Sequence, residues 1–176
     1  MFPIPYSSHE GKDWTVARLK ELAPKTILDV GAGSGTYVNL LRPYFPDTHF
    51  TGNEIFARYV TQFGLAGLYD EVIVGDVREL ELPEVDVIIF GDVLEHMEIH
   101  EAQDVWRRAR SVVRQAVVVS LPIVPYPQGP VDGNDHEAHV ADWSDELVRA
   151  YLLGITRSWT GVEIGVYIAG PDTSIA

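Results

Sequence analysis

A chain of 176 residues can bury one sizeable core but is short for two, so we expect a single domain over residues 1–176. Its 26 acidic residues outnumber the 13 lysines and arginines and give a net charge of −13, which argues against nucleic acid as a partner because such binding relies on basic side chains. The absence of cysteine excludes disulfides, thiolate metal sites and a cysteine nucleophile.

The residue pattern alternates between helices and strands. Apolar residues at helical spacing predict helices over 14–22, 37–41, 57–63 and 100–113, and apolar runs predict strands over 26–30, 49–54, 71–74, 85–90 and 116–120. The first of these helices closes an N-terminal segment, residues 1–24. Nearly continuous apolar strands between amphipathic helices are typical of a parallel sheet covered on both faces, so the predicted class is α/β.

A long irregular segment follows the last of these strands. Residues 121–142 contain four prolines and two glycines without periodicity, and we expect them to act as a lid or acceptor loop. A short helix is expected next, and then strands over 155–159 and 162–169, joined as a hairpin through Thr160 and Gly161. Because the chain shows no basic leader and no run of about 18 apolar residues, we expect a cytoplasmic protein without membrane contact.

The stretch ILDVGAGSGTY, residues 27–37, places three glycines directly after the first strand. Gly31, Gly33 and Gly35 allow a sharp turn and a close approach of the backbone to a ligand, and the amides of the following helix then face an anion. Glu54, at the end of the second strand, lies where an acid accepts hydrogen bonds from ribose hydroxyls in dinucleotide folds. The sequence therefore predicts a cofactor that carries both a ribose and an anionic group.

The spacing of the glycines separates two classes of cofactor. In the G-x-G-x-x-G fingerprint of NAD sites the third glycine would stand at position 36, which is Thr36 here. A hydride-transfer pair such as Tyr-x-x-x-Lys is not evident either. An NAD-dependent oxidoreductase is therefore the weaker alternative.

Four motifs in this order resemble those of class I S-adenosylmethionine-dependent methyltransferases: ILDVGAGSG, then GNEI at 52–55, GDVREL at 75–80 and GDVLEH at 91–96. The resemblance implies S-adenosylmethionine as the cofactor. It also implies an α/β three-layer Rossmann-like sandwich, with a mostly parallel seven-stranded sheet whose last strand is antiparallel.

The same resemblance implies a role for each motif residue. Asp29, Gly31, Gly33 and Asp92 would lie at the methionine end of the cofactor, Gly35 would shape the turn, Glu54 and Ile55 would meet the ribose, and Asp76 and Val77 would meet the adenine. Carboxylates suit these places because they accept hydrogen bonds from hydroxyl and amino donors. Asp92 and Glu95 also suit the N-terminus of a helix, which favours acids, so for Glu95 the sequence leaves a functional role and a helix-terminal role equally open.

The loops after the fourth and fifth strands would lie over the reactive methyl group, because ligands of open α/β sheets bind beyond the carboxyl ends of the strands. In these loops we expect His136 or His139 to contact the acceptor, with Asp135 as an orienting partner. His96 would shape the pocket. The predicted reaction is methyl transfer to an oxygen or nitrogen of a small-molecule acceptor, such as a sugar or other hydroxylated metabolite.

The same residues allow other interpretations. A divalent ion would take its ligands from His96, His100, Asp132, Asp135, His136, Glu137 and His139. The spacing HEAH differs from the H-E-x-x-H metal motif, so we expect no metal. An aminopropyl transferase or a non-catalytic cofactor-binding protein would also fit the glycine turn. The closing strands leave room for a homodimer, and the oligomeric state stays open.

Overall fold

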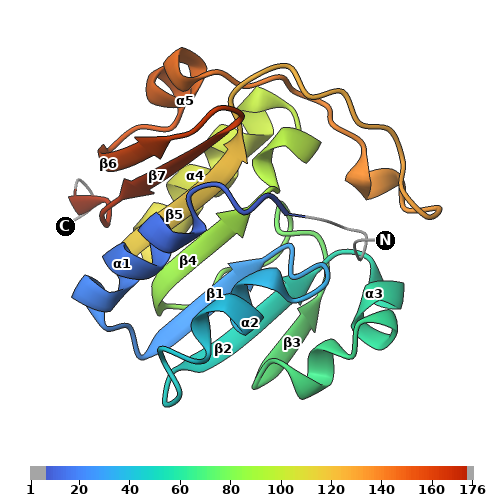
Figure 1. Ribbon diagram of the computed structural model, residues 1–176, viewed down its shortest axis with the longest axis vertical. Helices are drawn as coiled ribbons and strands as arrows, with labels where there is room; N and C mark the ends of the chain where they lie inside the picture. The colour runs from blue at the N-terminus through green and yellow to red at the C-terminus, as the bar shows by residue number, and fades with distance from the viewer. Residues whose placement is uncertain (1–6, 174–176) are drawn as a thin grey trace.

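A computed structural model describes residues 7–173, and a single seven-stranded sheet forms its centre (Figure 1). The strands are β1 (Thr26–Val30), β2 (His49–Glu54), β3 (Glu71–Val74), β4 (Val85–Gly91), β5 (Val113–Pro122), β6 (Ile155–Thr160) and β7 (Ile164–Ala169). Their order is β3-β2-β1-β4-β5-β7-β6. Neighbours among β1 to β5 are parallel, whereas β7 is antiparallel to both β5 and β6. The predicted sheet with a reversed last strand is confirmed.

Five α-helices and three short 3-10 helices connect the strands within the described residues. The α-helices are α1 (Lys12–Leu22), α2 (Thr36–Leu41), α3 (Ala57–Gln62), α4 (Ile99–Val112) and α5 (Asp145–Tyr151). The 3-10 helices are η1 (Leu65–Gly67), η2 (Leu94–His96) and η3 (Asp135–Glu137). In Figure 1, α1 and α2 lie in front of the sheet and α4 lies behind it, which makes the three layers of the predicted sandwich.

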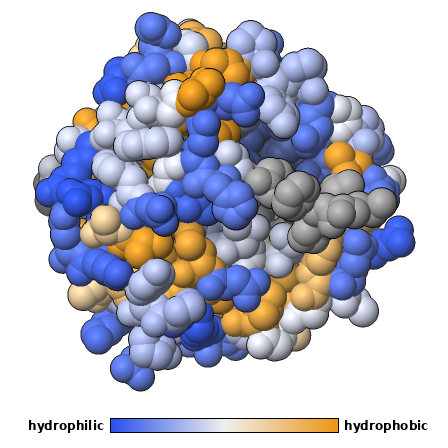
Figure 2. Space-filling view, in the orientation of Figure 1, coloured by the Kyte–Doolittle hydropathy of each residue, from blue (hydrophilic) through white to orange (hydrophobic). Residues whose placement is uncertain are grey.

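Two apolar cores lie on opposite faces of the sheet because successive strand residues point to opposite sides. On one face Leu28 and Ile88 belong to a cluster with Trp106 of α4. On the other face Ile27 belongs to a cluster with Leu19 of α1. The central strands are therefore buried on both faces, as their nearly continuous apolar sequences predict. The side of the molecule seen in Figure 2 is largely hydrophilic, with apolar side chains in a few separate areas.

The closing hairpin differs from the prediction in its turn. The second strand begins at Ile164 rather than Val162, because Gly161 donates its backbone N–H to the Ile164 carbonyl over 2.8 Å and closes a longer turn. Val162 stands at this turn with 81% of its surface exposed. An apolar side chain in a turn was thus mistaken for the start of a strand.

The predicted lid begins two residues later than expected, because β5 continues through Pro122. The rest of the segment crosses the carboxyl ends of the strands, and the Val140 and Ala141 amides donate to the Glu95 carbonyl over 2.8 and 3.1 Å. The loop also bonds to itself, since the His139 amide donates to the Gln128 carbonyl. These bonds fix the loop against η2. Within the described residues, no helix has the length and apolar character needed to cross a bilayer.

Candidate functional site

A cavity of about 510 Å³ opens at the carboxyl ends of β1, β2, β4 and β5, beneath the long loop. Its wall includes most of the predicted site residues: Asp29, Gly31, Gly33, Glu54, Ile55, Asp76, Val77, Asp92, His96, His136 and His139. Gly35 and Asp135 stand outside the lining. Residues from four separate motifs therefore converge on one space, which is the arrangement expected of a ligand site in an open α/β sheet.

The glycine turn leaves β1 in a backbone conformation that other residues adopt at a cost. Gly31, Gly33 and Gly35 have φ angles of 71°, 50° and 78°, all in the left-handed region. Gly35 is the N-cap residue of α2, so it shapes the turn as predicted while Gly31 and Gly33 face the cavity. The turn is held to the next strand by the Ala32 amide, which donates to the Asn53 carbonyl over 2.9 Å.

Glu54 ends β2 and ties the glycine turn to the loop after its own strand. Its Oε2 accepts from the Gly33 amide and its Oε1 accepts from the Phe56 amide, each over 2.8 Å. Burial raises the pKa of the Glu54 carboxyl, and these two amides oppose that rise. A carboxylate has about four acceptor positions, so two are left for hydroxyl donors in the cavity.

Asp76 follows β3 and is engaged by a neighbouring cation. The Arg78 guanidinium donates to both of its oxygens, at 2.6 to 3.0 Å, and holds the pKa of the Asp76 carboxyl below its usual range. Arg78 also pairs with Glu101 of α4 over 2.9 Å. Val77 is buried next to them. The Asp76 carboxylate and the apolar Val77 side chain therefore lie together at the β3 end of the cavity.

Asp29 lies at the end of β1 with 2% of its surface exposed. Its Oδ2 accepts from the Tyr69 hydroxyl over 2.5 Å, and burial raises the pKa of its carboxyl to about 7. The charge of Lys12 opposes this rise. A buried carboxylate inside a strand is not a helix cap, and Asp29 faces the cavity instead.

Asp92 and Glu95 follow β4, where the chain turns into η2. Asp92 adopts a φ of 56°, which is uncommon for a residue other than glycine and concentrates at functional sites. Glu95 is 1% exposed, and neither of its carboxylate oxygens has a hydrogen-bond partner within the described part of the chain. Burial raises the pKa of the Glu95 carboxyl well above its usual value, and the charge of Asp92 raises it further. A buried carboxyl group without a partner is stable only when it is protonated or when it contacts a bound ligand.

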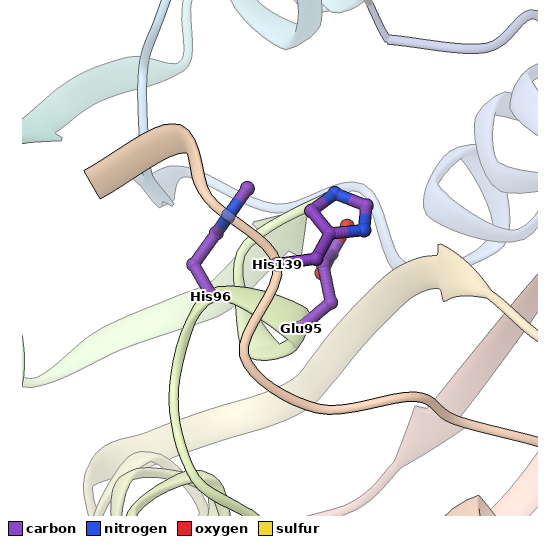
Figure 3. A group of neighbouring side chains, drawn as sticks. All are labelled: Glu95, His96 and His139. Atoms are coloured by element: carbon purple, nitrogen blue, oxygen red, sulfur yellow. The ribbon is translucent and has the colours of Figure 1, made fainter. Parts of the chain in front are cut away.

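The loop histidines separate into two positions. His139 lies beside His96, with ring centroids 4.9 Å apart, and Glu95 approaches both from below (Figure 3). His136 lies instead near the carboxylates of Glu54 and Asp76. Its charge opposes the rise in the pKa of Glu54 that burial causes, and it adds to the lowering of the pKa of Asp76 by Arg78. The structure thus puts His139 at the β4 end of the cavity and His136 at the β2 and β3 end.

Asp135 does not adjoin the cavity histidines in the expected way. It begins η3, is exposed and stays outside the cavity lining, because the Asn134 side chain caps η3 by accepting from the His136 amide over 3.1 Å. The acids that face the loop histidines are instead Glu54 and Asp76 near His136, and Asp92 and Glu95 near His139. The expectation of an Asp135 orienter therefore lacks support from the geometry.

Two residues near the site carry no signal in the sequence. Lys12 is 5% exposed, although a lysine in the first turn of a helix is typical of the surface. Its Nζ donates to Ser7 Oγ over 2.7 Å and lies 4.4 Å from the Tyr37 ring centroid. Burial lowers the pKa of Lys12, and the nearby charges of Asp92 and Asp29 oppose that fall. Lys12 is thus a countercharge to Asp29 and Asp92. The second residue that only the tertiary structure shows is Tyr69, whose hydroxyl donates to Asp29.

A protein-family model described as a methyltransferase domain matches residues 28–118, which is more than half of the chain. The chain belongs to this methyltransferase family. The match spans the glycine turn and the motifs after β2, β3 and β4, and this confirms the resemblance seen in the sequence.

The methyltransferase domain is also similar to malonyl-[acyl-carrier protein] O-methyltransferase of Neorickettsia risticii, with 28% identity over 111 residues. This similarity covers 62% of the chain and 42% of the relative, so the chain spans less than half the length of that curated protein.

Solved structures share the fold at low identity. Human N-acetylserotonin methyltransferase in complex with S-adenosylmethionine gives a TM-score of 0.71 at 15% identity, covering 93% of this chain and 52% of that one. Magnesium protoporphyrin IX methyltransferase from Synechocystis PCC 6803 with bound S-adenosylhomocysteine gives 0.70 at 18% identity, covering 93% and 83%. These likenesses confirm the Rossmann-like fold of the methyltransferase domain, and the two complexes agree with the expected cofactor.

Proposed function

We propose that the cavity binds S-adenosylmethionine and that the protein transfers its methyl group to an oxygen or nitrogen of a small-molecule acceptor. The observation that carries this proposal is the convergence of four motif residues, Asp29, Glu54, Asp76 and Asp92, on one cavity. A volume of about 510 Å³ lies within the usual range of small-ligand sites, roughly 300 to 1,000 Å³. The names of the two solved relatives, which denote N-acetylserotonin and magnesium protoporphyrin IX, support a small acceptor.

The cofactor would lie along the carboxyl ends of the strands. The two unused acceptor positions of Glu54 suit the ribose hydroxyls, and Ile55 flanks them. Asp76 and Val77 suit the amino group and the ring of adenine. Asp29 suits the methionine end. When bound, S-adenosylmethionine supplies a methyl group that its sulfonium already activates, so the protein has mainly to align the acceptor and exclude water.

The acceptor would lie at the β4 end, beneath the long loop. We favour His139 over His136 as the residue that contacts it, because His139 lies half-buried beside Asp92 and Glu95. Burial lowers the pKa of His139, which leaves a neutral imidazole that can accept a hydrogen bond or a proton from an acceptor hydroxyl. His96 shapes the same wall. A sugar or other hydroxylated metabolite fits this chemistry.

The test of this acceptor site is the release of S-adenosylhomocysteine in the presence of mixtures of hydroxylated and amine-bearing small molecules. We expect turnover with the wild type and a loss of at least about 100-fold in the His139→Ala variant, because positioned acid–base groups contribute roughly 10² to 10⁴ in rate. Binding of S-adenosylhomocysteine, measured by calorimetry, should be unchanged in that variant. Equal turnover by the wild type and His139→Ala would refute the assignment of His139.

A different enzyme class receives less support. An NAD-dependent oxidoreductase would share the sheet, but the family match and Thr36 in place of the third glycine favour the methyltransferase. An aminopropyl transferase would use a related cofactor in the same cavity. S-adenosylhomocysteine as the product distinguishes methyl transfer from both.

A further inference from the structure

Glu95, His96 and His139 bring three metal-ligating side chains to one point on the cavity wall. One ligand atom from each lies within 4.8 Å of the other two (Figure 3). Glu95 and His96 come from η2 and His139 from the long loop, so the loop completes the group by folding over η2. Three residues from two segments that are distant in sequence thus face one another.

The carboxylate of Glu95 has no partner of its own. The Glu95 side chain is almost fully buried, with 1% of the residue exposed, and neither carboxylate oxygen has a hydrogen bond within residues 7–173. Leaving a buried carboxylate unpaired is costly, whereas a cation bound between it and the imidazoles would satisfy it. The side chain points toward His139 rather than toward solvent (Figure 3).

His96 is held against the long loop through one of its ring nitrogens. His96 Nδ1 lies 3.1 Å from the Ala138 carbonyl, so a proton on Nδ1 is donated there and Nε2 is left with its lone pair. Metal-ligating histidines usually hold their second nitrogen to a carbonyl or a carboxylate in this way, which fixes the tautomer and the ring orientation. The Ala138 carbonyl belongs to the same loop as His139.

We infer that Glu95, His96 and His139 form a site for one divalent first-row transition cation at the acceptor end of the cavity. Two imidazoles and one carboxylate suit Zn²⁺, Mn²⁺ or Co²⁺ better than the all-oxygen ligand sets of Mg²⁺ and Ca²⁺. Metal–nitrogen and metal–oxygen distances of roughly 2.0 to 2.2 Å put ligand atoms about 3.0 to 3.4 Å apart, so the three atoms would have to draw together by up to about 1.5 Å through side-chain rotation. Three protein ligands leave coordination positions open to the cavity.

This ligand set differs from the one weighed in the sequence, which paired histidines that are neighbours along the chain. His100 is exposed on α4, and Asp132 and Asp135 are exposed on the loop. The structure replaces them with Glu95. If the proposed methyl transfer holds, the open positions of the cation would receive an acceptor oxygen, and His139 would then act on the acceptor through the cation rather than as a free base. This role rests on the proposed function. Binding of the cation does not.

The test is a titration of the chelator-treated full chain with Co²⁺, followed by visible absorption, with Zn²⁺ as a competitor. We expect one equivalent to bind and the affinity to fall at least about 100-fold in Glu95→Gln and in His139→Ala, because even outer partners of metal ligands commonly contribute 10- to 100-fold. His100→Ala is the matched control, since this histidine lies four residues after His96 and is exposed on α4, and it should bind Co²⁺ like the wild type.

Several results would overturn the cation site: no uptake by the wild type, unchanged affinity in Glu95→Gln and His139→Ala, or an equal loss in His100→Ala. Melting with S-adenosylhomocysteine, recorded for each variant, shows whether the variant is folded and tests the proposed function separately. Cobalt binding without a response to the adenosyl ligand would uphold the cation site and refute the proposed cofactor. The reverse result would refute the cation site alone.

Discussion

Replacing Glu54 with alanine is expected to weaken the binding of S-adenosylhomocysteine at least about 100-fold. The change removes two acceptor positions for ribose hydroxyls, and a hydrogen bond to a charged group is worth roughly 1.5 to 3 kcal/mol. It also frees the Gly33 amide, which now donates to Glu54 over 2.8 Å and holds the glycine turn. Isothermal calorimetry on the purified variant measures the loss.

A matched control comes from the neighbouring strand. Glu71 on β3 is an exposed glutamate outside the cavity lining, so Glu71→Ala removes the same charge without touching the proposed site. Its affinity should equal that of the wild type. If Glu54→Ala also binds as tightly as the wild type, the ribose is not held at β2 and the proposed orientation of the cofactor is wrong.

The second large effect is expected from Gly31→Ala. Its φ of 71° costs an alanine roughly 1 to 2 kcal/mol, and the added Cβ would lie 2.5 Å from Val93 Cγ2. Val93 lines the cavity and follows directly on Asp92, so the clash displaces the wall that faces the cofactor. We expect the variant to lose at least about tenfold in affinity for S-adenosylhomocysteine. We also expect its free energy of unfolding in urea to fall by the backbone cost plus about 1 to 3 kcal/mol from the clash.

Gly64→Ala separates the clash from the backbone cost. Gly64 has a φ of 63°, yet a Cβ built on it meets no atom within 4 Å, and it stays outside the cavity lining. In this variant the free energy of unfolding should fall only by the backbone cost of alanine at positive φ, and the affinity for S-adenosylhomocysteine should equal that of the wild type. Equal behaviour of the two variants in urea denaturation and calorimetry would show that close packing at Gly31 has no part in the site.

The fold was predictable because its signals are local. The strands at 26–30 and 85–90 are mostly apolar on both faces, with Asp29 and Asp86 as the charged exceptions, and this pattern indicates burial on both sides before any contact is known. Ends of elements were less certain. Val162 was assigned to a strand on its side chain alone, whereas the hydrogen bond from Gly161 to Ile164 decides the turn, and that bond depends on how two strands meet.

The cofactor side of the site was predictable for the same reason. Asp29 and the glycines lie within one turn, and Glu54 ends the next strand, so sequence order brings them to one edge of the sheet. Whether they bind S-adenosylmethionine as assigned stays a prediction. The family model spans these residues without testing their roles.

The acceptor side depends on how the long loop folds, which its proline-rich sequence does not specify. His136 and His139 are three residues apart, yet the His139 ring lies beside His96 whereas His136 faces the Glu54 and Asp76 carboxylates. In the sequence, Glu95 fits an acid at a helix N-terminus as well as it fits a site residue. Only its burial without a hydrogen-bond partner separates the two interpretations. Lys12 could not be found at all, because its neighbours Asp29 and Asp92 come from distant strands.

The measurement that tests the central claim most directly is the melting temperature of the protein with S-adenosylmethionine, S-adenosylhomocysteine and NAD, each added separately. A ligand that binds only the folded protein adds about 2.7 kcal/mol at roughly 100 times its Kd. The cavity described here predicts an increase with both adenosyl ligands and none with NAD. An increase with NAD alone, or no increase with either adenosyl ligand, would contradict the assignment of the glycine turn to S-adenosylmethionine.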